Sequence, residues 1–410
     1  MKEAWIIDAA RTPRAVGKPG KGAYSGMHSQ RLMATVLQAL EKRNNLCTTD
    51  VDDVIVGCAT QVKQQGCCIA RMSALDAGWS VNASGVTLDR FCGSGITAVG
   101  MAANSIMAGM EDLVVAGGVE MMSYTASLGH PGHIDAGNLH LRDLHPMGNV
   151  GISADIIAQE SGITREDIDR LGAESQRRAA YAMANGHFSR SLVPVYRDDG
   201  SLALDREEYP RPGTTYETLS QLKAVFGMMM DMPVEEGGST TFRQLVEKRW
   251  PGIQVNHIHS AGTASGVVDG AAGLILASPE YAKAHGMTPR ARVRTIVNSG
   301  GSPAHILNQP GPAALKAVKR AGMSIKDIDL FEVNEAFAVV VLKFMRDLGL
   351  DPAKVNPNGG AMALGHPIGA TGAVLIGTLL DELERQNKTL GMVTMCAAGG
   401  MAPAIIIERI

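Results

Sequence analysis

Cys92 is the first residue of the chain whose surroundings suggest chemistry. It follows an apolar, β-prone run at 86–88, it precedes Gly93 and Gly95, and a helical pattern continues over 98–108. This order predicts a strand, a tight turn and a helix. Free backbone N–H groups at a helix N-terminus stabilise a thiolate, so we expect the pKa of Cys92 to be lowered. An inert core cysteine is the commoner case, so a nucleophile needs a base and an oxyanion site elsewhere in the chain.

An internal repeat offers the base. The segment 48–56 (TTDVDDVIV) resembles the segment 324–332 (SIKDIDLFE), and this alignment sets Cys58 against Asn334. It also places Cys92 and His366 at equivalent strand-to-helix turns. If the two halves pack about a pseudo-twofold axis, these residues would face each other, with His366 as base. The alternative for His366 is a hydrogen-bonded histidine in a turn.

Two further residues could take part. Cys396 follows an apolar strand pattern at 392–395. A second thiol near the base could carry a proton, and an inert core thiol is an equal alternative. Asn334 starts a helix pattern, which predicts a helix N-cap. It could also donate a hydrogen bond to an oxyanion or to an ordered water, and both roles can hold together.

Two weaker motifs compete with this hypothesis. Gly93-x-Gly95-x-x-Ala98 after a strand also fits a dinucleotide-binding fingerprint, although that pattern does not explain the cysteine before it. His257-x-His259 could hold a metal, but no carboxylate or cysteine accompanies it at a useful spacing. We therefore expect a surface loop at these two histidines.

The elements around these residues alternate between strand and helix. Strand patterns occupy 4–9, 53–58 and 113–117, and a helix pattern with one apolar face occupies 29–43. This alternation predicts an α/β protein with a largely buried sheet. The pattern changes at about 120, where helices are expected over 152–160 and 165–185, the second with Thr164 as N-cap. We therefore predict an N-terminal half (1–119 and 264–287), an inserted loop domain (120–263) and a C-terminal half (288–410).

Composition limits the partners. The chain has 410 residues, a net charge of -3, 45% hydrophobic residues and 19% charged residues. This balance gives no reason to expect nucleic acid or an anionic membrane as partner. No run of 18 apolar residues and no signal peptide is evident, so we expect a cytoplasmic protein with reduced thiols and no membrane insertion. The six cysteines form no C-x-x-C pair, so no metal site is expected.

Four motifs together resemble a known family. The Cys92 turn, Asn334-Glu335-Ala336-Phe337, the 359–372 stretch with His366, and Cys396 are similar to those of the thiolases, in thiolase order and over almost the whole chain. The resemblance implies a five-layer αβαβα fold, built from two similar βαβαβαββ halves with a loop domain over the active site. It agrees with the repeat.

The resemblance also implies roles. Cys92 would accept the acyl group, His366 would activate Cys92, and Cys396 would exchange a proton with the α-carbon of the acetyl group. Asn334 would hold a water that, with His366, stabilises the enolate oxygen of acetyl-CoA. Backbone N–H groups of Cys92 and Ala398 would stabilise the tetrahedral intermediates.

The implied substrates are coenzyme A and acyl-CoA, with no tightly bound cofactor. Residues that match CoA contacts of the family are Met147, Lys223, Ser265, Ala336 and Phe337. Members of the family form homodimers or dimers of dimers, so the same is expected here.

Four features depart from the family pattern. Thr263 stands where Asn is usual, which puts a loop hydrogen bond in question, and Pro146 replaces a histidine of short-chain biosynthetic members. Ala398 replaces a glycine and would be strained if the backbone needed a positive φ. An insertion at about 227–257 carries Met228, Met229, Met230 and Met232, which could line an adaptable acyl pocket or serve loop packing.

The function predicted is reversible thiolytic cleavage of 3-ketoacyl-CoA to acetyl-CoA and a shortened acyl-CoA, in the degradative direction. Alternatives are a biosynthetic acetyltransferase that forms acetoacetyl-CoA and a non-catalytic member that binds CoA. A decarboxylating ketoacyl synthase would need a second histidine in place of Asn334 and Cys396. A nicotinamide dehydrogenase rests on the glycine fingerprint alone.

Overall fold

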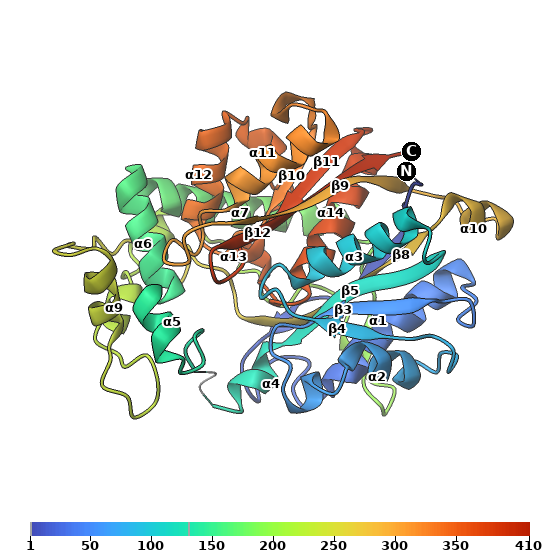
Figure 1. Cartoon of the computed structure of the whole chain (residues 1–410), viewed down its shortest axis with the longest axis horizontal. Coiled ribbons are helices and arrows are strands. Elements are labelled where there is room, and N and C mark those ends of the chain that lie inside the picture. The colour runs from blue at the N-terminus through green and yellow to red at the C-terminus, as the bar shows by residue number, and fades with distance from the viewer. Residues whose placement is uncertain (1, 130–131) are drawn as a thin grey trace.

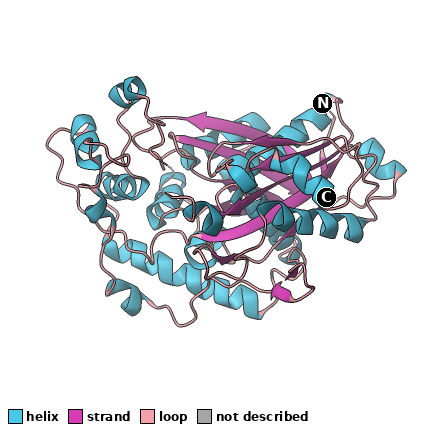
Figure 2. Ribbon diagram, turned by 90° about the horizontal axis from the view of Figure 1, so that it is seen from below, coloured by secondary structure: helices cyan, strands magenta, loops and turns pink. Residues whose placement is uncertain are grey.

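Five layers make up the body of the protein in a computed structural model that describes residues 2–129 and 132–410. From top to bottom in Figure 1 they are outer helices, a sheet, two central helices, a second sheet and outer helices. The expected αβαβα architecture is therefore confirmed. A helical lobe extends from one end, and Figure 2 shows the strands gathered at the other.

The sheet of the N-terminal half has the order β4-β3-β5-β8-β1. Its strands are β1 (Trp5–Arg11), β3 (Asp53–Gly57), β4 (Val86–Leu88), β5 (Leu113–Met121) and β8 (Val268–Ala277), and the short β2 (Ala15–Val16) pairs with β8. Every residue of β5 and β8 is buried, because helices cover both faces. This explains why both strands read as unbroken apolar and small-residue runs.

The sheet of the C-terminal half has the order β10-β11-β12-β9. Its strands are β9 (Ala291–Gly300), β10 (Leu330–Val333), β11 (Leu390–Thr394) and β12 (Met401–Arg409). The two sheets join through two residue pairs between β1 and β9. The counterpart of β4 is reduced to one bridge between Phe331 and Val355, so the halves are similar but unequal.

The repeat is present, but its register differs from the sequence alignment. The two central helices α3 (Ser94–Ala108) and α14 (Thr371–Arg385) are equivalent, and each starts two residues after its counterpart position, Cys92 or Gly369. Cys92 therefore matches Gly369 and not His366. Asp52 and Asp329 support this register, because each accepts from the backbone at the start of the neighbouring parallel strand. Local letter matches misled the alignment, because the two turns differ in length.

The central helices cross where each has a glycine. A Cβ on Gly95 would lie 2.7 Å from the backbone N of Ala373, and a Cβ on Gly372 would lie 2.2 Å from the N of Ile96. The contacts are reciprocal, as a pseudo-twofold axis requires. Of the supposed dinucleotide fingerprint, Gly95 therefore serves helix packing, and Gly93 allows a close approach of Pro403.

Outer helices complete the layers. α1 (Ser29–Asn44) and α2 (Ile69–Asp76) cover the N-terminal sheet, and α11 (Pro310–Ala321) and α12 (Ala338–Leu348) cover the C-terminal sheet. The apolar face predicted for 29–43 is the buried face of α1. The short α10 (Pro279–Ala284) follows β8, and α13 (Ala361–Leu364) precedes His366.

The segment between β5 and β8 supplies the lobe and also packs on the body of the protein. Its elements are α4 (Met122–Ala126), α5 (Leu139–Leu144), α6 (Val150–Ser161), α7 (Arg165–Ala184), β6 (Val195–Tyr196), β7 (Leu202–Leu204), α8 (Tyr216–Ser220) and α9 (Phe242–Arg249). Thr164 caps α7 in a reciprocal box with Asp167, as predicted.

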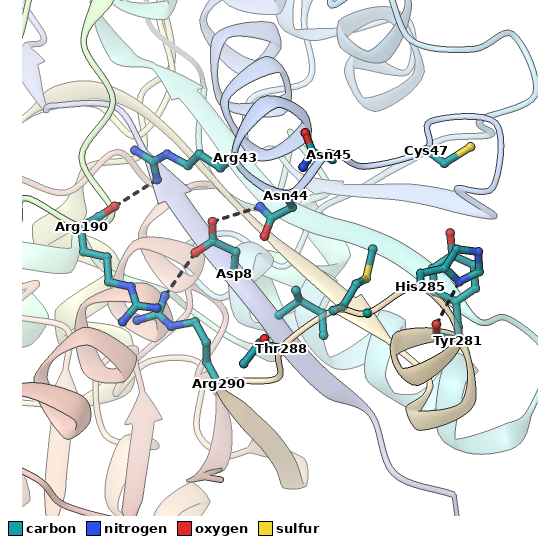
Figure 3. A pocket seen from close by; sticks show the side chains of 13 residues that line it. Asp8, Arg43, Asn44, Asn45, Cys47, Arg190, Tyr281, His285, Thr288 and Arg290 are labelled. Atoms are coloured by element: carbon teal, nitrogen blue, oxygen red, sulfur yellow. Dashed lines mark hydrogen bonds and ion pairs between the residues drawn. The ribbon is translucent and has the colours of Figure 1, made fainter.

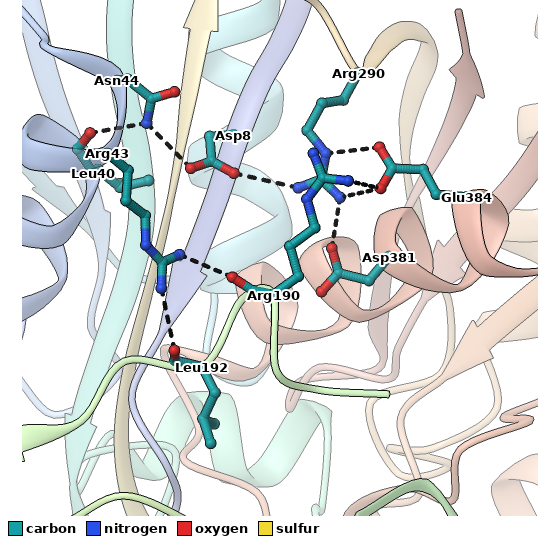
Figure 4. A network of polar contacts seen from close by, with 9 residues as sticks. All are labelled: Asp8, Leu40, Arg43, Asn44, Arg190, Leu192, Arg290, Asp381 and Glu384. Atoms are coloured by element: carbon teal, nitrogen blue, oxygen red, sulfur yellow. Dashed lines mark hydrogen bonds and ion pairs between the residues drawn. The ribbon is translucent and has the colours of Figure 1, made fainter. Parts of the chain in front are cut away.

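A buried arginine ties the parts together (Figure 4). The guanidinium of Arg290, at the start of β9, contacts Asp8 of β1 at 3.3 Å and Asp381 of α14 at 2.6 Å. Glu384 of α14 adds a bond at 2.7 Å. Burial alone would lower the pKa of Arg290, but the carboxylates raise it overall, so the cation is retained.

One stretch, 91–108, is long and apolar enough by composition to cross a membrane. Of this window, 61% is buried inside the protein, because α3 packs against β5 and α14. The core of the fold accounts for its hydropathy.

Candidate active site

The turn that carries Cys92 is held by its own residues. Ser94 Oγ accepts from the N–H of Arg90 at 2.8 Å and donates to the carbonyl of Phe91 at 2.6 Å. Phe91 has a φ of 49°, which is a strained conformation for a bulky side chain. Backbone strain of this kind is typical of functional sites, so its position directly before Cys92 agrees with a nucleophile turn.

The thiol of Cys92 is not the stabilised thiolate expected from the sequence. Burial raises the pKa of Cys92 to about 12, and its own backbone N–H offsets this only in part. The prediction of a lowered pKa was wrong, because loss of hydration outweighs the helix N-terminus here. The resting group is a neutral thiol, which must lose its proton to a base during the reaction.

His366 has the state that a base needs. Burial lowers the pKa of His366 to about 4, so its imidazole is neutral. Nδ1 lies 2.6 Å from Thr371 Oγ1, and that hydroxyl donates to the carbonyl of Pro367 at 2.9 Å. The hydroxyl must therefore accept from Nδ1–H, which leaves the lone pair on Nε2. Thr371 thus selects the tautomer that can take a proton.

Asn334 lies beside that lone pair. Its Nδ2 is 3.4 Å from His366 Nε2, and its Oδ1 is buried without a partner in the described chain. The helix N-cap predicted for Asn334 is wrong, because α12 begins only at Ala338. Residues 334–337 instead run from β10 along the segment 263–265, to which Phe337 forms a bridge.

Cys396 and Ala398 are near the nucleophile. A Cβ on Gly93 would lie 3.4 Å from Cβ of Ala397, so the two loops touch. Burial, and after it the charge of Cys92, raises the pKa of Cys396. In the part of the chain that the structure describes, neither the backbone N–H of Cys92 nor that of Ala398 donates to a backbone carbonyl. Both N–H groups are therefore available to an oxyanion, and that of Cys92 also faces its own thiol.

The departure at Ala398 carries no strain. The positive φ angles in this loop belong to Gly399 and Gly400, at 77° and 75°, and Ala398 is not among the described non-glycine residues with positive φ. The strain that the sequence suggested is therefore absent. With it goes the only support for a member of the fold without turnover.

Thr263 makes the loop bond that its replacement of Asn put in question. Its Oγ1 accepts from the N–H of Ser260 at 2.9 Å and lies 3.3 Å from the carbonyl of Ser260. The same loop places Ser265, whose N–H donates to the carbonyl of Ala336 at 2.9 Å. The next residue, Gly266, accepts from the N–H of His366 at 2.8 Å. The segment 263–266 therefore contacts Ala336 on one side and His366 on the other.

Comparison with known proteins agrees with this geometry. The model of "Thiolase, N-terminal domain" matches residues 4–230, and that of "Thiolase, C-terminal domain" matches residues 287–409. The chain belongs to the thiolase family. It is 40% identical to a steroid 3-ketoacyl-CoA thiolase of Mycobacterium tuberculosis, over all of this chain and 95% of that protein.

Two further relatives are named for other acyl groups. A β-ketoadipyl-CoA thiolase of Escherichia coli is 38% identical, with complete coverage of both chains. A crystal structure of an acetyl-CoA acetyltransferase of Bacillus anthracis is 31% identical, with a TM-score of 0.83 over 100% of this chain and 99% of that one. These proteins share the thiolase fold with this chain and differ in the acyl groups that their names state.

Three further residues were expected to contact CoA, and the structure connects them less closely to Cys92 and His366. Met147 is buried, and its carbonyl lies 3.0 Å from His133 Nε2. Phe337 is buried against Phe226, with ring centres 5.3 Å apart. Lys223 is exposed, and no bond joins it to the catalytic residues in the described chain. The CoA roles of these three residues remain predictions.

The H-x-H motif changes meaning in this thiolase. His257 and His259 do have a carboxylate between them, Asp155, and His259 is fully buried, so the surface loop expected there was wrong. The described residues contain no cluster of three or more metal-ligating side chains. A cavity of about 600 Å³, lined by residues such as Asp8, Arg43 and Tyr281, includes none of the catalytic residues (Figure 3).

The sequence analysis missed Thr371 and Glu120. Glu120 is a fully buried carboxylate that accepts from Ala59 N and Gly369 N, both at 2.9 Å, and so links the loops of the two halves. An acidic residue in the otherwise apolar strand 113–121 was the available signal for Glu120. For Thr371, five residues after His366, no signal separated it from any other helix start.

Proposed function

We propose that this thiolase cleaves 3-ketoacyl-CoA with CoA, in the degradative direction. What supports this is a neutral thiol, Cys92, and a neutral imidazole, His366, whose free lone pair is fixed by Thr371, at turns that precede two crossing helices. Two curated relatives at 38–40% identity are named for the cleavage of ketoacyl groups larger than acetoacetyl. The biosynthetic alternative is less favoured, because the acetyl-CoA acetyltransferase that matches is only 31% identical.

The first half-reaction forms the acyl-enzyme. His366 Nε2 accepts the proton of the Cys92 thiol as sulfur attacks the 3-keto carbon of the substrate. The N–H groups of Cys92 and Ala398 bind the resulting oxyanion. The C2–C3 bond then breaks, acetyl-CoA leaves as its enolate, and Cys396 gives the α-carbon a proton. Asn334 and His366, through a water, stabilise the enolate oxygen.

The second half-reaction releases the shortened acyl-CoA. The thiol of a new CoA molecule loses its proton to Cys396 and attacks the thioester at Cys92. Cys92 leaves and recovers a proton from His366, so the enzyme returns to its starting state. Ping-pong kinetics follow from this order.

We also propose that Met147, Lys223, Ser265, Ala336 and Phe337 contact the CoA part of the substrate, that no cofactor is tightly bound, and that the enzyme is a cytoplasmic homo-oligomer. A homodimer is supported by β4, the edge strand beside Cys92, because no described strand pairs with its outer side. The halves and loop domain, with boundaries at 119, 263 and 287, remain a proposal.

The acyl group is proposed to be large, with the 227–257 insertion controlling its size. The four methionines divide between two roles. Met230 is buried and Met229 packs beside it, in a cluster with Ile152 and Val246. Met228 and Met232 are 75% and 47% exposed, which leaves them free to meet a ligand.

The test is the intact mass of the protein after mixing with short, long and cyclic 3-ketoacyl-CoA thioesters without free CoA. We expect a gain of one acyl group that is absent in Cys92→Ala. In Cys396→Ala, acylation of Cys92 by a simple acyl-CoA should persist while exchange of acetyl α-protons stops. A normal rate of exchange in that variant would remove Cys396 from the mechanism, and no adduct with any thioester would remove the proposed function.

A further inference from the structure

A carboxylate in the lobe holds both histidines of the H-x-H motif. Asp155, in α6, is fully buried, and its Oδ1 lies 2.7 Å from His259 Nδ1. Its Oδ2 lies 2.8 Å from His257 Nδ1. Oδ1 also accepts from the backbone N–H of His259 at 3.0 Å. These bonds fix the plane of each ring, because a carboxylate bond to Nδ1 leaves the imidazole no free rotation.

The two histidines differ in what their rings touch. The ring of His259 is fully buried and meets Phe337 edge-on, with centres 5.5 Å apart and an interplanar angle of 89°. Phe337 in turn packs on Phe226. His257 is partly exposed and lies against Gly227, and no ring contact joins it to Phe337. Asp155 thus hydrogen-bonds to two imidazoles, and of these only the ring of His259 contacts Phe337.

The position of Phe337 affects the rest of the site. Phe337 bridges to Ala264, and Ser265 N–H donates to the carbonyl of Ala336. Both Ala336 and Ser265 line the proposed CoA site. A shift of Phe337 would therefore move both walls of that site, while Cys92, which stands on another element, would stay.

The charges around His259 leave it no other anchor. Asp155 is the carboxylate bonded to the ring, and Asp169, on α7, pairs with Arg165. Nε2 of His259 has no hydrogen-bond partner among the described residues. Its orientation therefore depends on Asp155 on one side and on the ring of Phe337 on the other.

We propose that His259 is a positioning residue for CoA: its imidazole, oriented by Asp155, holds Phe337 against the thioester end of the substrate. This inference rests on the proposed function, because it assumes that Phe337 and Ala336 contact CoA thioesters. An edge-to-face pair of this kind contributes enough to change a binding constant by up to about tenfold.

Three variants of the full-length enzyme separate the ring from the hydrogen bond. His259→Asn keeps an N–H donor for Asp155 and removes the ring. We expect it to raise the KM for CoA and for 3-ketoacyl-CoA about tenfold, with kcat within about threefold. His259→Phe keeps the ring and removes the donor that orients it, so it should lower the Tm and raise both KM values by less than His259→Asn does. The matched control, His257→Asn, removes an imidazole from the same carboxylate and should leave KM unchanged.

Two readouts exclude a general structural effect. The rate at which iodoacetamide alkylates Cys92 should be the same in all three variants, because that small reagent does not use the CoA walls. In a Phe337→Leu background, His259→Asn should add no further loss of CoA affinity, because the two residues act in series.

The inference is overturned if His259→Asn leaves both KM values unchanged, or if His257→Asn raises them equally. It is also overturned if kcat and the alkylation rate fall together with affinity. Should His259→Asn fail to fold, a loss of CoA affinity of about tenfold or more in His259→Phe would contradict it equally, because that variant keeps the ring. Calorimetric titration with free CoA gives the same comparison without turnover, so a failure of the proposed reaction stays distinguishable from a failure of this role.

Discussion

At the scale of the residue, the site works with neutral partners. The thiol of Cys92 has a raised pKa and the imidazole of His366 a lowered pKa, so both groups are neutral before the reaction. A buried ion pair would cost desolvation of both charges before any chemistry began. The neutral pair avoids this cost, and the free N–H groups of Cys92 and Ala398 act on the charge that develops later.

Alkylation of Cys92 tests this state. Because iodoacetamide reacts with the thiolate and the pKa of Cys92 is raised to about 12, the rate should rise about tenfold per pH unit between pH 6.5 and 9.5 without a plateau. Peptide mapping by mass spectrometry would follow Cys92 separately from the exposed cysteines. A plateau near pH 7 would show a stabilised thiolate and contradict the neutral pair.

Thr371 offers a test of the tautomer. Thr371→Val keeps the shape of the side chain but removes the acceptor for His366 Nδ1–H, which leaves a buried donor unpaired. We expect kcat to fall about 10- to 100-fold with little change in the KM for CoA, since an unpaired buried donor costs about 1–3 kcal/mol. Thr371→Ser retains the hydroxyl and should retain most activity. Equal kcat values for Val and Ser would rule out the tautomer role.

At the scale of the element, the crossing of α3 and α14 places the two catalytic turns. Both turns precede the N-terminal ends of these helices, and the helices touch at Gly95 and Gly372. The approach is possible only because neither residue has a Cβ. The spacing between Cys92 and His366 therefore depends on a helix contact that neither residue makes.

Gly372→Val should disturb that contact. Its Cβ would lie 2.2 Å from the backbone N of Ile96, so the helices must move apart. We expect the unfolding free energy to fall by about 1–3 kcal/mol, the usual cost of overpacking, together with a large loss of kcat. Denaturant unfolding and steady-state kinetics would measure both. A control is Gly311→Ala in α11, where nothing lies within 4 Å of the added Cβ. Full activity of Gly372→Val would mean that the crossing does not set the catalytic spacing.

At the scale of the whole molecule, buried acids make stability depend on pH. Glu332, in β10, is buried, its Oε1 has no partner in the described chain, and burial raises its pKa well above the usual range, with Glu335 and Glu382 adding to this. The folded state keeps a proton that the unfolded chain loses above about pH 4.3. This contribution to stability is fully present below that pH and is lost as pH rises toward the folded pKa.

Glu332→Gln should therefore weaken the pH dependence. The difference in unfolding free energy between variant and wild type should shift in favour of the variant by up to about 1.4 kcal/mol per pH unit between pH 5 and 8. Denaturant unfolding at several pH values measures this slope. Any packing cost of the amide would appear as a constant difference in unfolding free energy and would not change the slope with pH. Parallel curves for the two proteins would show that Glu332 is ionised in the folded state.

The sequence by itself determined the chemistry and the layers. Cys92, His366, Cys396 and Asn334 stand in short motifs, and the alternation of strand and helix patterns predicted the α/β layers, because both depend on neighbours in the chain. Two residues depart from the family pattern without a change in local structure. Thr263 still makes a hydrogen bond within its loop, and the backbone at Ala398 has no positive φ. Their loops could accept them for local reasons.

Only the tertiary structure decided the protonation states of Cys92 and His366, the register of the internal repeat, and the buried carboxylates that hold the site residues. The pKa values of Cys92 and His366 follow from burial, which collects segments far apart in the sequence. The equivalence of Cys92 with Gly369 follows from where two helices begin. Asp155 joins His259 from about a hundred residues away, and Glu120 joins Gly369 across the two halves. Such contacts have no signature in sequence spacing, because packing between distant segments creates them.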